Sequence, residues 1–300
     1  MTEKKMYSRE EFETMRREAA AAMSGDAGLA DRAREVLIGA DRYHWIHQTT
    51  WFGEPILNLP QDMFAIQEII HRSRPRYVLE IGVAWGGSLL FYATMLQVLG
   101  GEKVIGVDVY IPPDLRNRLA GHGPLSERLA LIAGSSTDET TVAAVKEIIG
   151  ASREVLVILD SHHSHAHVLE ELRLYSPLVG KGQYLVCGDT IIESMPVEAH
   201  RPRPWGPGDS PRTALAAFLQ TTDRFAVDEA LDRKLLFTCN PGGYLKCLKD
   251  CRKGNGIKRR AISPAPRGYL PLRGDAGHQQ EKGDENKTQE DCRPVGQEQG

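Results

Sequence analysis

The feature that most constrains the fold of this chain is a series of five short runs rich in valine, isoleucine and leucine. They are YVLEIGV (77–83), KVIGVDV (103–109), LALIAGS (129–135), VLVILDS (155–161) and QYLVCGDT (183–190). Runs that are apolar on both faces are typical of buried parallel strands. Amphipathic helices are expected between or after them, at 86–99, 138–149, 163–175 and 211–221. This alternation predicts an α/β sandwich with a parallel sheet.

Two further apolar segments follow the last helix, KLLFTCN (234–240) and GYLKCLK (243–249). Pro241 and Gly242 separate them, which favours an antiparallel hairpin. The predicted fold is therefore a Rossmann-like, doubly wound and mostly parallel seven-stranded sheet with an antiparallel hairpin at its edge.

The composition changes twice along the chain. Residues 1–39 carry apolar positions at helical spacing among many charges, so a helical arm is expected there. Residues 40–249 form the predicted α/β domain, and residues 250–300 are so polar that a disordered tail is expected. An amphipathic arm favours a homo-oligomer.

Composition excludes several classes of function. The formal net charge of -3 gives no positive field for nucleic acid. No apolar stretch is long enough to span a membrane, and the N-terminal residues lack a signal peptide, so a cytoplasmic protein is expected. The five cysteines form no CxxC pair, which fits a reducing compartment.

Acidic residues stand at or near the carboxyl ends of four predicted strands. They are Glu80, Asp108, Asp160 and Asp189. A single carboxylate after a strand is often only a helix cap. Because ligands of such sheets bind beyond the carboxyl ends of the strands, four acids at one edge favour a binding site.

The glycine-containing loop EIGVAWGGS (80–88) follows the first strand. A pyrophosphate-binding loop needs glycine where Ala84 stands, and the carboxylate of Glu80 would repel phosphate. A cationic cofactor without phosphate suits this edge better. S-adenosylmethionine fits, since Asp108 could accept hydrogen bonds from its ribose hydroxyls. A nicotinamide oxidoreductase is disfavoured for the same reasons.

Asp160 and Asp189 end the fourth and fifth strands, where a second substrate is expected. Two carboxylates with water are a typical Mg²⁺ site, and such an ion could orient and activate a substrate hydroxyl. The alternative is that both are capping aspartates without metal.

Four histidines follow Asp160 within seven residues: His162, His163, His165 and His167. His163 and His167 could share a helical face as zinc ligands, but no suitably spaced residue completes a tetrahedral set. A general base, His163 or His165, is the better interpretation.

A long segment rich in proline, arginine and glycine precedes the last helix, between residues 193 and 210. A loop of this length is usually functional or disordered. Beside the fifth strand it could cover the substrate, with Trp205 stacking on a flat group and Arg201 or Arg203 meeting an anion. A merely mobile loop is the alternative.

Together these pieces resemble the cephalosporin hydroxylase family of methyltransferases, which includes rhamnosyl O-methyltransferases. The similarity runs from Trp45 to Lys249 and rests on PILNLPQDMFAIQEII, VLEIGVAWGGSLLFYATML, VIGVDV, GSSTDETTV, VLVILDSHHSHAHVLEELRLYSPLV, YLVCGDTIIE, GPGDSPRTAL and LLFTCNPGGYLK, in order. It implies a class I methyltransferase fold, with S-adenosylmethionine at the first glycine loop and Mg²⁺ at Asp160 and Asp189.

Residues are carried over from this resemblance by position. The implied cofactor-binding residues are Glu80, Gly82, Ala84, Gly86, Ser88, Asp108, Ser136 and Asp160. The implied metal ligands are Asp160 and Asp189. The chain departs from the family at Gly188, where a glutamate is usual, and at His162, where asparagine is common; His162 or Glu193 could compensate.

The leading hypothesis is an S-adenosylmethionine-dependent, Mg²⁺-assisted O-methyltransferase that acts on a hydroxyl of a sugar or specialised metabolite. Asp160 and a histidine, His163 or His165, are its candidate catalytic residues, and a small molecule or glycan is the acceptor. The alternative is a cofactor-binding accessory protein that lost catalysis together with the glutamate at position 188.

Overall fold

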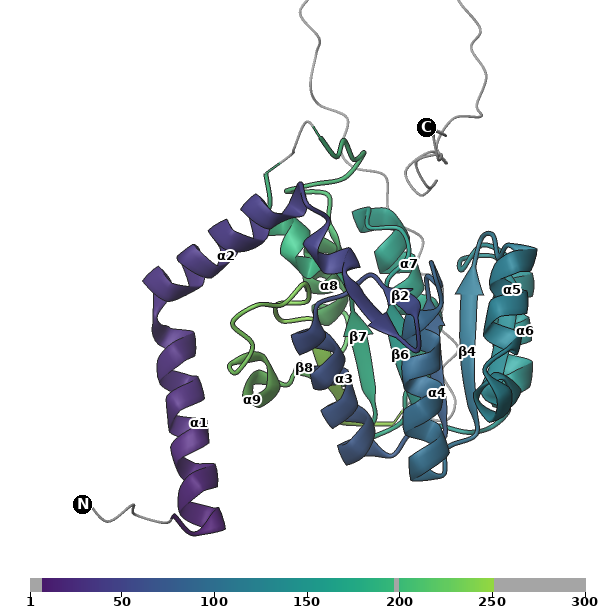
Figure 1. Ribbon diagram of the computed structural model, residues 1–300, viewed down its shortest axis with the longest axis horizontal. Coiled ribbons are helices and arrows are strands. Elements are labelled where there is room, and N and C mark those ends of the chain that lie inside the picture. The colour runs from purple at the N-terminus through teal and green to yellow at the C-terminus, as the bar shows by residue number, and fades with distance from the viewer. Residues whose placement is uncertain (1–6, 197–199, 251–300) are drawn as a thin grey trace, which may run out of the picture. The chain divides into compact units, whose positions relative to one another are not determined.

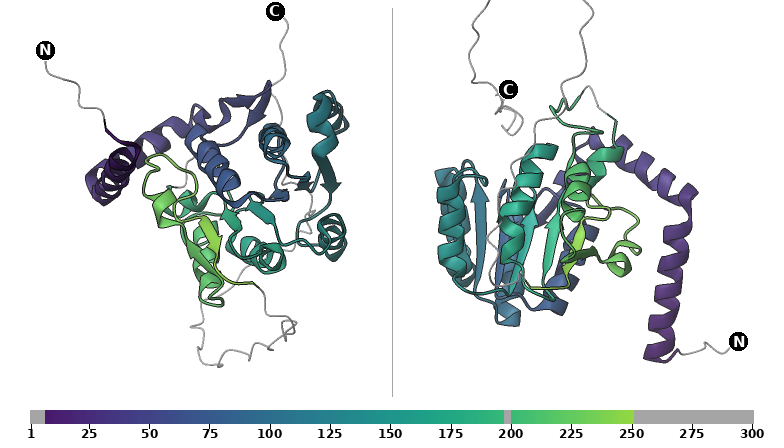
Figure 2. Two further views of the ribbon diagram at one scale, coloured as in Figure 1. Left: turned by 90° about the horizontal axis from the view of Figure 1, so that it is seen from below. Right: turned by 180° about the vertical axis from the view of Figure 1, so that it is seen from behind.

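The computed structural model describes residues 7–196 and 200–250. Its centre is a seven-stranded sheet in the order β5-β4-β3-β6-β7-β9-β8, seen edge-on in Figure 2. The strands are β3 (Tyr77–Ile81), β4 (Lys103–Asp108), β5 (Leu129–Ala133), β6 (Val155–Leu159), β7 (Tyr184–Cys187), β8 (Phe225–Val227) and β9 (Tyr244–Cys247). A short antiparallel hairpin, β1 (Thr49–Trp51) and β2 (Glu54–Ile56), forms a second sheet.

Helices cover both faces of the large sheet, as Figure 1 and Figure 2 show. The α-helices are α1 (Arg9–Gly25), α2 (Ala27–Asp41), α3 (Pro60–Ser73), α4 (Gly87–Leu99), α5 (Pro113–Ala120), α6 (Glu139–Ile149), α7 (His165–Tyr175), α8 (Pro211–Leu219) and α9 (Glu229–Asp232). The 3₁₀ turns are η1 (Trp45–His47), η2 (Gly123–Arg128), η3 (Ser176–Leu178) and η4 (Thr190–Ser194).

Alternating side chains of the strands divide the core into two layers. On one face Val78, Val104 and Leu156 pack with α3, α4 and α5. On the other face Leu79 and Val157 pack with α6, α7 and α8. Burial of both faces explains why the strands read as continuous apolar runs in the sequence.

The sheet confirms the predicted doubly wound fold with an antiparallel edge, but one predicted strand is wrong. β9 pairs antiparallel with β7 and with β8, so the edge hairpin is formed by β8 and β9. The segment 234–240 has no strand. Its backbone is drawn instead towards α3, because the Cys239 N–H and the Thr238 hydroxyl donate to the buried carboxylate of Asp62.

Helices α1 and α2 occupy the predicted N-terminal arm. The arm bends at Asp26, whose carboxylate caps α2 by accepting from the Leu29 N–H. α2 buries Ala33 and Leu37, whereas α1 has no buried residue. No helix in the described part of the chain is long and apolar enough to cross a membrane. The tail expected at 250–300 lies outside the described residues from 251 onwards.

Candidate active site

The glycine loop after β3 is pressed against the end of β6. Gly82 has φ +99°, and a Cβ built on it would lie 2.0 Å from the Asp160 carbonyl oxygen. Gly87 begins α4 under the β1–β2 hairpin, where a Cβ would lie 2.4 Å from the Pro55 carbonyl oxygen. Both positions therefore require glycine because neighbouring backbone leaves no room for a Cβ. The approach of a phosphate group is not needed to explain these glycines.

Two of the predicted acids accept hydrogen bonds from this loop and from α4. Glu80 is buried and accepts hydrogen bonds from the hydroxyls of Ser88 (2.8 Å) and Tyr92 (3.0 Å). Burial raises the pKa of Glu80 to about 8, and nearby Asp108 adds to the rise. Asp108 accepts from the Val83 N–H at 2.8 Å, so it fixes the backbone of the loop. Both acids therefore contact the glycine loop or the start of α4.

Ser136, which follows β5, belongs to a buried network. Its hydroxyl donates to Glu171 Oε1 at 2.5 Å and lies 3.1 Å from His167 Nε2. Ser161, directly after Asp160, donates to the same Glu171 oxygen at 2.6 Å. Glu171 on α7 therefore connects the turns that follow β5 and β6, a role that was not predicted from the sequence.

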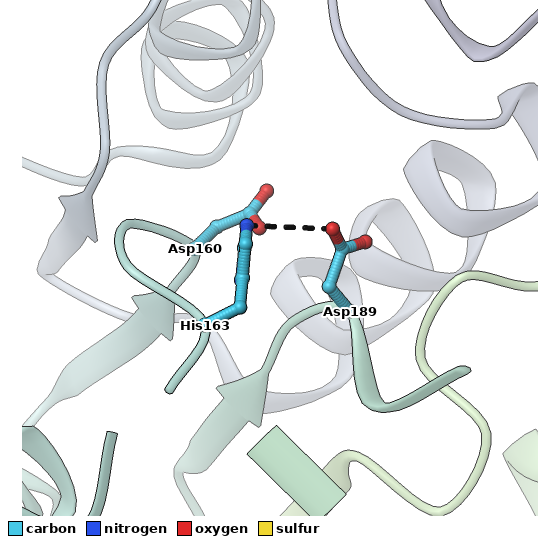
Figure 3. A group of neighbouring side chains, drawn as sticks. All are labelled: Asp160, His163 and Asp189. Carbon is cyan, nitrogen blue, oxygen red and sulfur yellow. Dashed lines mark ion pairs between the residues drawn. The ribbon is translucent and has the colours of Figure 1, made fainter. Parts of the chain in front are cut away.

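Asp160, His163 and Asp189 converge at the carboxyl ends of β6 and β7 (Figure 3). Each offers one ligand atom, and these atoms all lie within 4.8 Å of one another. His163 Nε2 is 3.5 Å from Asp189 Oδ2. Asp160 follows β6, His163 lies in the turn before α7, and Asp189 follows β7 with φ 51°. The structure thus brings together both predicted metal ligands and one of the two candidate bases.

Burial and like charge act strongly in this cluster. Burial raises the pKa of Asp160 well above its usual value, and Asp189 and Glu80 raise it further. Burial also lowers the pKa of His163, and only Asp189 and Glu171 oppose that shift. The imidazole is therefore neutral near pH 7. A divalent cation would relieve the repulsion between the two aspartates, so these donors fit a metal ion.

The other three histidines face elsewhere. His165 begins α7, where its Nδ1 lies 2.8 Å from the Thr213 hydroxyl of α8. His167 pairs with Glu171 at 3.0 Å. The His162 ring lies against His167 and Trp205, with centroids 5.0 and 4.6 Å away. The weaker zinc interpretation, with His163 and His167 as joint ligands, finds no support in this geometry.

Neither suggested replacement for a carboxylate at position 188 reaches the cluster. Glu193 accepts from the Ser210 hydroxyl at 2.6 Å and from the Gly208 N–H at 3.0 Å. The His162 Nδ1 is 3.0 Å from the Ser164 hydroxyl. His163 is the additional donor that stands beside the aspartates.

Sequence reasoning missed the residues that position Asp189. The Asp189 N–H donates to the side-chain oxygen of Asn240 at 2.8 Å. The segment that carries Asn240 is anchored by Asp62, which is buried on α3 and also accepts from the Tyr244 hydroxyl at 2.7 Å. Burial raises the pKa of Asp62 to about 6. Asp62 reads in the sequence as an ordinary acid in the first turn of a helix, so only the structure reveals this role.

A cavity opens beside Asp189, between the N-terminal arm and the segment 200–206. Residues on its walls include Leu37, Asp41, Trp45, Ile192, Arg201 and Arg203. Asp41, the last residue of α2, pairs with His200 Nε2 at 2.9 Å and with Arg201 Nη1 at 2.8 Å. Trp205 packs its edge against His162 and His163. The described part of the predicted loop thus borders the cluster of Asp160, His163 and Asp189.

The fold and the site together define the class of this protein. A parallel sheet whose last strand enters antiparallel between its neighbours, with a glycine loop after the first strand and an acid after the second, is a Rossmann-like methyltransferase fold. The cluster at β6 and β7 lies at the same edge of the sheet, beside this glycine loop.

Comparison with known proteins gives the family. Residues 43–248 match the profile of the family Rhamnosyl O-methyltransferase/CmcI, and the chain belongs to that family. It is an S-adenosylmethionine-dependent O-methyltransferase. The family match confirms the resemblance seen in the sequence and favours an enzyme over an accessory protein or an oxidoreductase.

Three relatives illustrate the similarity. The rhamnosyl O-methyltransferase of Mycobacterium bovis (strain BCG / Pasteur 1173P2) is 30% identical over 69% of this chain and 84% of its own. That of Mycobacterium leprae (strain TN) is 32% identical over 69% of this chain and 89% of its own. An apo-structure of CmcI is 19% identical, with a TM-score of 0.49 over 67% of this chain and 77% of that one.

Proposed function

We propose that this enzyme transfers the methyl group of S-adenosylmethionine to a hydroxyl of a sugar or specialised metabolite, with Asp160 and Asp189 holding Mg²⁺. The observation that carries the proposal is the convergence of Asp160, His163 and Asp189. Gly82 of the glycine loop lies against the Asp160 carbonyl. A bound cation would stabilise the negative charge that develops on the acceptor oxygen.

The cofactor side of the site is assigned to the loop after β3. We assign to it Glu80, Gly82, Ala84, Gly86, Ser88, Asp108 and Ser136, with Asp160 at the border. At Gly82 the loop contacts the carbonyl of Asp160, so one backbone contact connects the proposed cofactor site with the proposed metal site. Such coupling supports in-line transfer, because the methyl carbon and the acceptor oxygen must be held in register.

The acceptor side is assigned to the cluster and to the cavity beside Asp189. His163 is the histidine that we place at the acceptor side, because it lies 3.5 Å from Asp189 whereas His165 is engaged by Thr213 on α8. In the transfer a carbon–oxygen bond forms while the carbon–sulfur bond breaks. The sulfonium becomes a thioether, and the hydroxyl proton leaves to solvent.

The names of the relatives support a sugar acceptor. Both mycobacterial proteins are named rhamnosyl O-methyltransferases, so a rhamnoside is the first acceptor to test. The cavity wall carries the indole of Trp45 and, nearby, that of Trp205, which are suited to the apolar face of a sugar ring.

An acceptor panel tests this proposal. The purified protein receives S-adenosylmethionine labelled in its methyl group, Mg²⁺, and either methyl α-L-rhamnopyranoside or the matched mono-deoxy rhamnosides. We expect a labelled methyl ether on one hydroxyl and its loss in the analogue that lacks this hydroxyl. No labelled methyl ether on any of these rhamnosides would refute a rhamnoside as the acceptor.

A further inference from the structure

The cluster of Asp160, His163 and Asp189 contains one nitrogen donor among its oxygens. Within the described residues these three form the group of side chains that could hold a metal ion. Two other acids at this edge already accept hydrogen bonds from neighbouring residues. Glu80 accepts from two hydroxyls, and Glu193 accepts from Ser210 and Gly208. The third ligand atom available from a side chain is therefore an imidazole nitrogen.

Position 188 offers no oxygen donor and little space for one. A Cβ built on Gly188 would lie 2.8 Å from Asp160 Oδ1 and 2.8 Å from the Leu159 carbonyl oxygen. A side chain there would have to displace the carboxylate of Asp160 or the end of β6. The packing around Asp160 is thus adapted to glycine, and the donor set depends on His163.

The geometry of His163 suits a ligand. Ligand bonds of about 2.1 Å place two atoms bound to one ion roughly 2.9 to 4.2 Å apart. The separation of 3.5 Å between His163 Nε2 and Asp189 Oδ2 lies in this range. The edge of Trp205, with centroids 5.4 Å apart, packs against the His163 ring from the loop side.

We propose that His163 Nε2 is the third protein ligand of the ion held by Asp160 and Asp189, and that the site binds Co²⁺ more tightly than Mg²⁺. The inference rests on the metal site of the proposed function. Imidazole suits the later transition metals, whereas Mg²⁺ prefers oxygen. A nitrogen that ligates the ion cannot take the hydroxyl proton, so this assignment gives His163 a ligand role in place of a base role.

The test uses the full chain loaded with Mn²⁺ alone. Electron spin echo spectroscopy detects a nitrogen bound directly to Mn²⁺, and calorimetry measures the affinities for Mn²⁺, Co²⁺ and Mg²⁺. The variants are His163→Ala, which removes the nitrogen, Asp189→Asn, which removes an oxygen, and His165→Ala as the matched control. Thermal melting and the binding of S-adenosylhomocysteine show that each variant is folded.

We expect a nitrogen signal in the wild type and in His165→Ala, and none in His163→Ala. Removal of a residue that only hydrogen-bonds a metal ligand already costs about tenfold in metal affinity, and removal of a ligand itself should cost more. His163→Ala should therefore weaken Co²⁺ binding by at least about tenfold, and Mg²⁺ binding by much less. Asp189→Asn should weaken the binding of both ions.

Bound Mn²⁺ without a nitrogen signal in the wild type would overturn the inference while leaving the metal site of the proposed function intact. Absence of any Mn²⁺ binding would overturn both the ligand role and the metal site. Methyl transfer from S-adenosylmethionine that persists in EDTA would then show that the enzyme works without an ion. The two failures are therefore distinguishable.

Discussion

Replacing Gly82 by alanine should damage the protein in a way that the structure specifies. The new Cβ would lie 2.0 Å from the carbonyl oxygen of Asp160, where ordinary contact needs more than 3 Å. It would also have to adopt a φ of +99°. The loop and the end of β6 must therefore move apart by about 1 Å.

The expected cost has two parts. A non-glycine residue in this backbone region costs about 1 to 3 kcal/mol. Forcing a methyl group into a filled space costs a further 1 to 3 kcal/mol or so. The free energy of unfolding should fall by about 4 kcal/mol, which lowers the Tm by about 10 °C for a domain of this size. Because the loop is displaced, the Kd for S-adenosylmethionine should rise by at least about tenfold.

Gly53→Ala is the matched control, because Gly53 also has a positive φ, +88°, but a Cβ there would meet nothing within 4 Å. This variant should lose only the backbone contribution, about 2 kcal/mol, and melt about 5 °C below the wild type. Differential scanning calorimetry gives both values. A Gly82→Ala protein that melts no lower than Gly53→Ala would refute the proposed contact between the loop and β6.

Two other contacts give predictions of their own. Glu80 has a pKa of about 8 in the folded protein, raised by burial, so the unfolded chain loses this proton first and stability falls as pH rises from about 4.5 to 8. Glu80→Gln removes this pH dependence. Between pH 5 and 8, its free energy of unfolding in urea should therefore rise by about 4 kcal/mol relative to that of the cofactor-free wild type. Parallel curves of stability against pH for the two proteins would contradict the assignment. At Asp41, burial raises the pKa, but hydrogen bonds and ion pairs with His200 and Arg201 outweigh it and lower the pKa overall. Their contribution is full above pH 4 and is lost as pH falls further. Asp41→Asn should therefore cost about 1 to 2 kcal/mol at pH 7 and less at pH 3. It should also speed chymotryptic cleavage after Trp205, and unchanged cleavage would show that the pair does not hold the loop.

The sequence predicted the parts of this fold that depend on local pattern. Parallel strands buried on both faces must be apolar throughout, so β3, β4, β6 and β7 could be read directly. The edge strand β5 is apolar as well but only partly buried. Asp160 and Asp189 could be placed together because both follow such strands and parallel strands end at one edge.

Contacts between distant segments could not be read in this way. The segment 234–240 is apolar enough for a strand, but its hydrogen bonds go to Asp62, about 176 residues earlier. The choice between His163 and His165 depended on where α7 begins, since a residue in the preceding turn faces Asp189 and the first helical residue faces α8. A difference of two residues in the start of the helix thus decides which histidine enters the site.

The most direct test of the account is the turnover of Asp160→Asn, measured as S-adenosylhomocysteine released at saturating S-adenosylmethionine and acceptor. The substitution keeps the shape of the side chain and removes the charge at the centre of the cluster. We predict a loss of at least about a thousandfold in kcat with the Kd for S-adenosylhomocysteine nearly unchanged, because we assign the cofactor mainly to the loop after β3. Turnover at the wild-type rate would contradict the assignment of Asp160 to the reacting site.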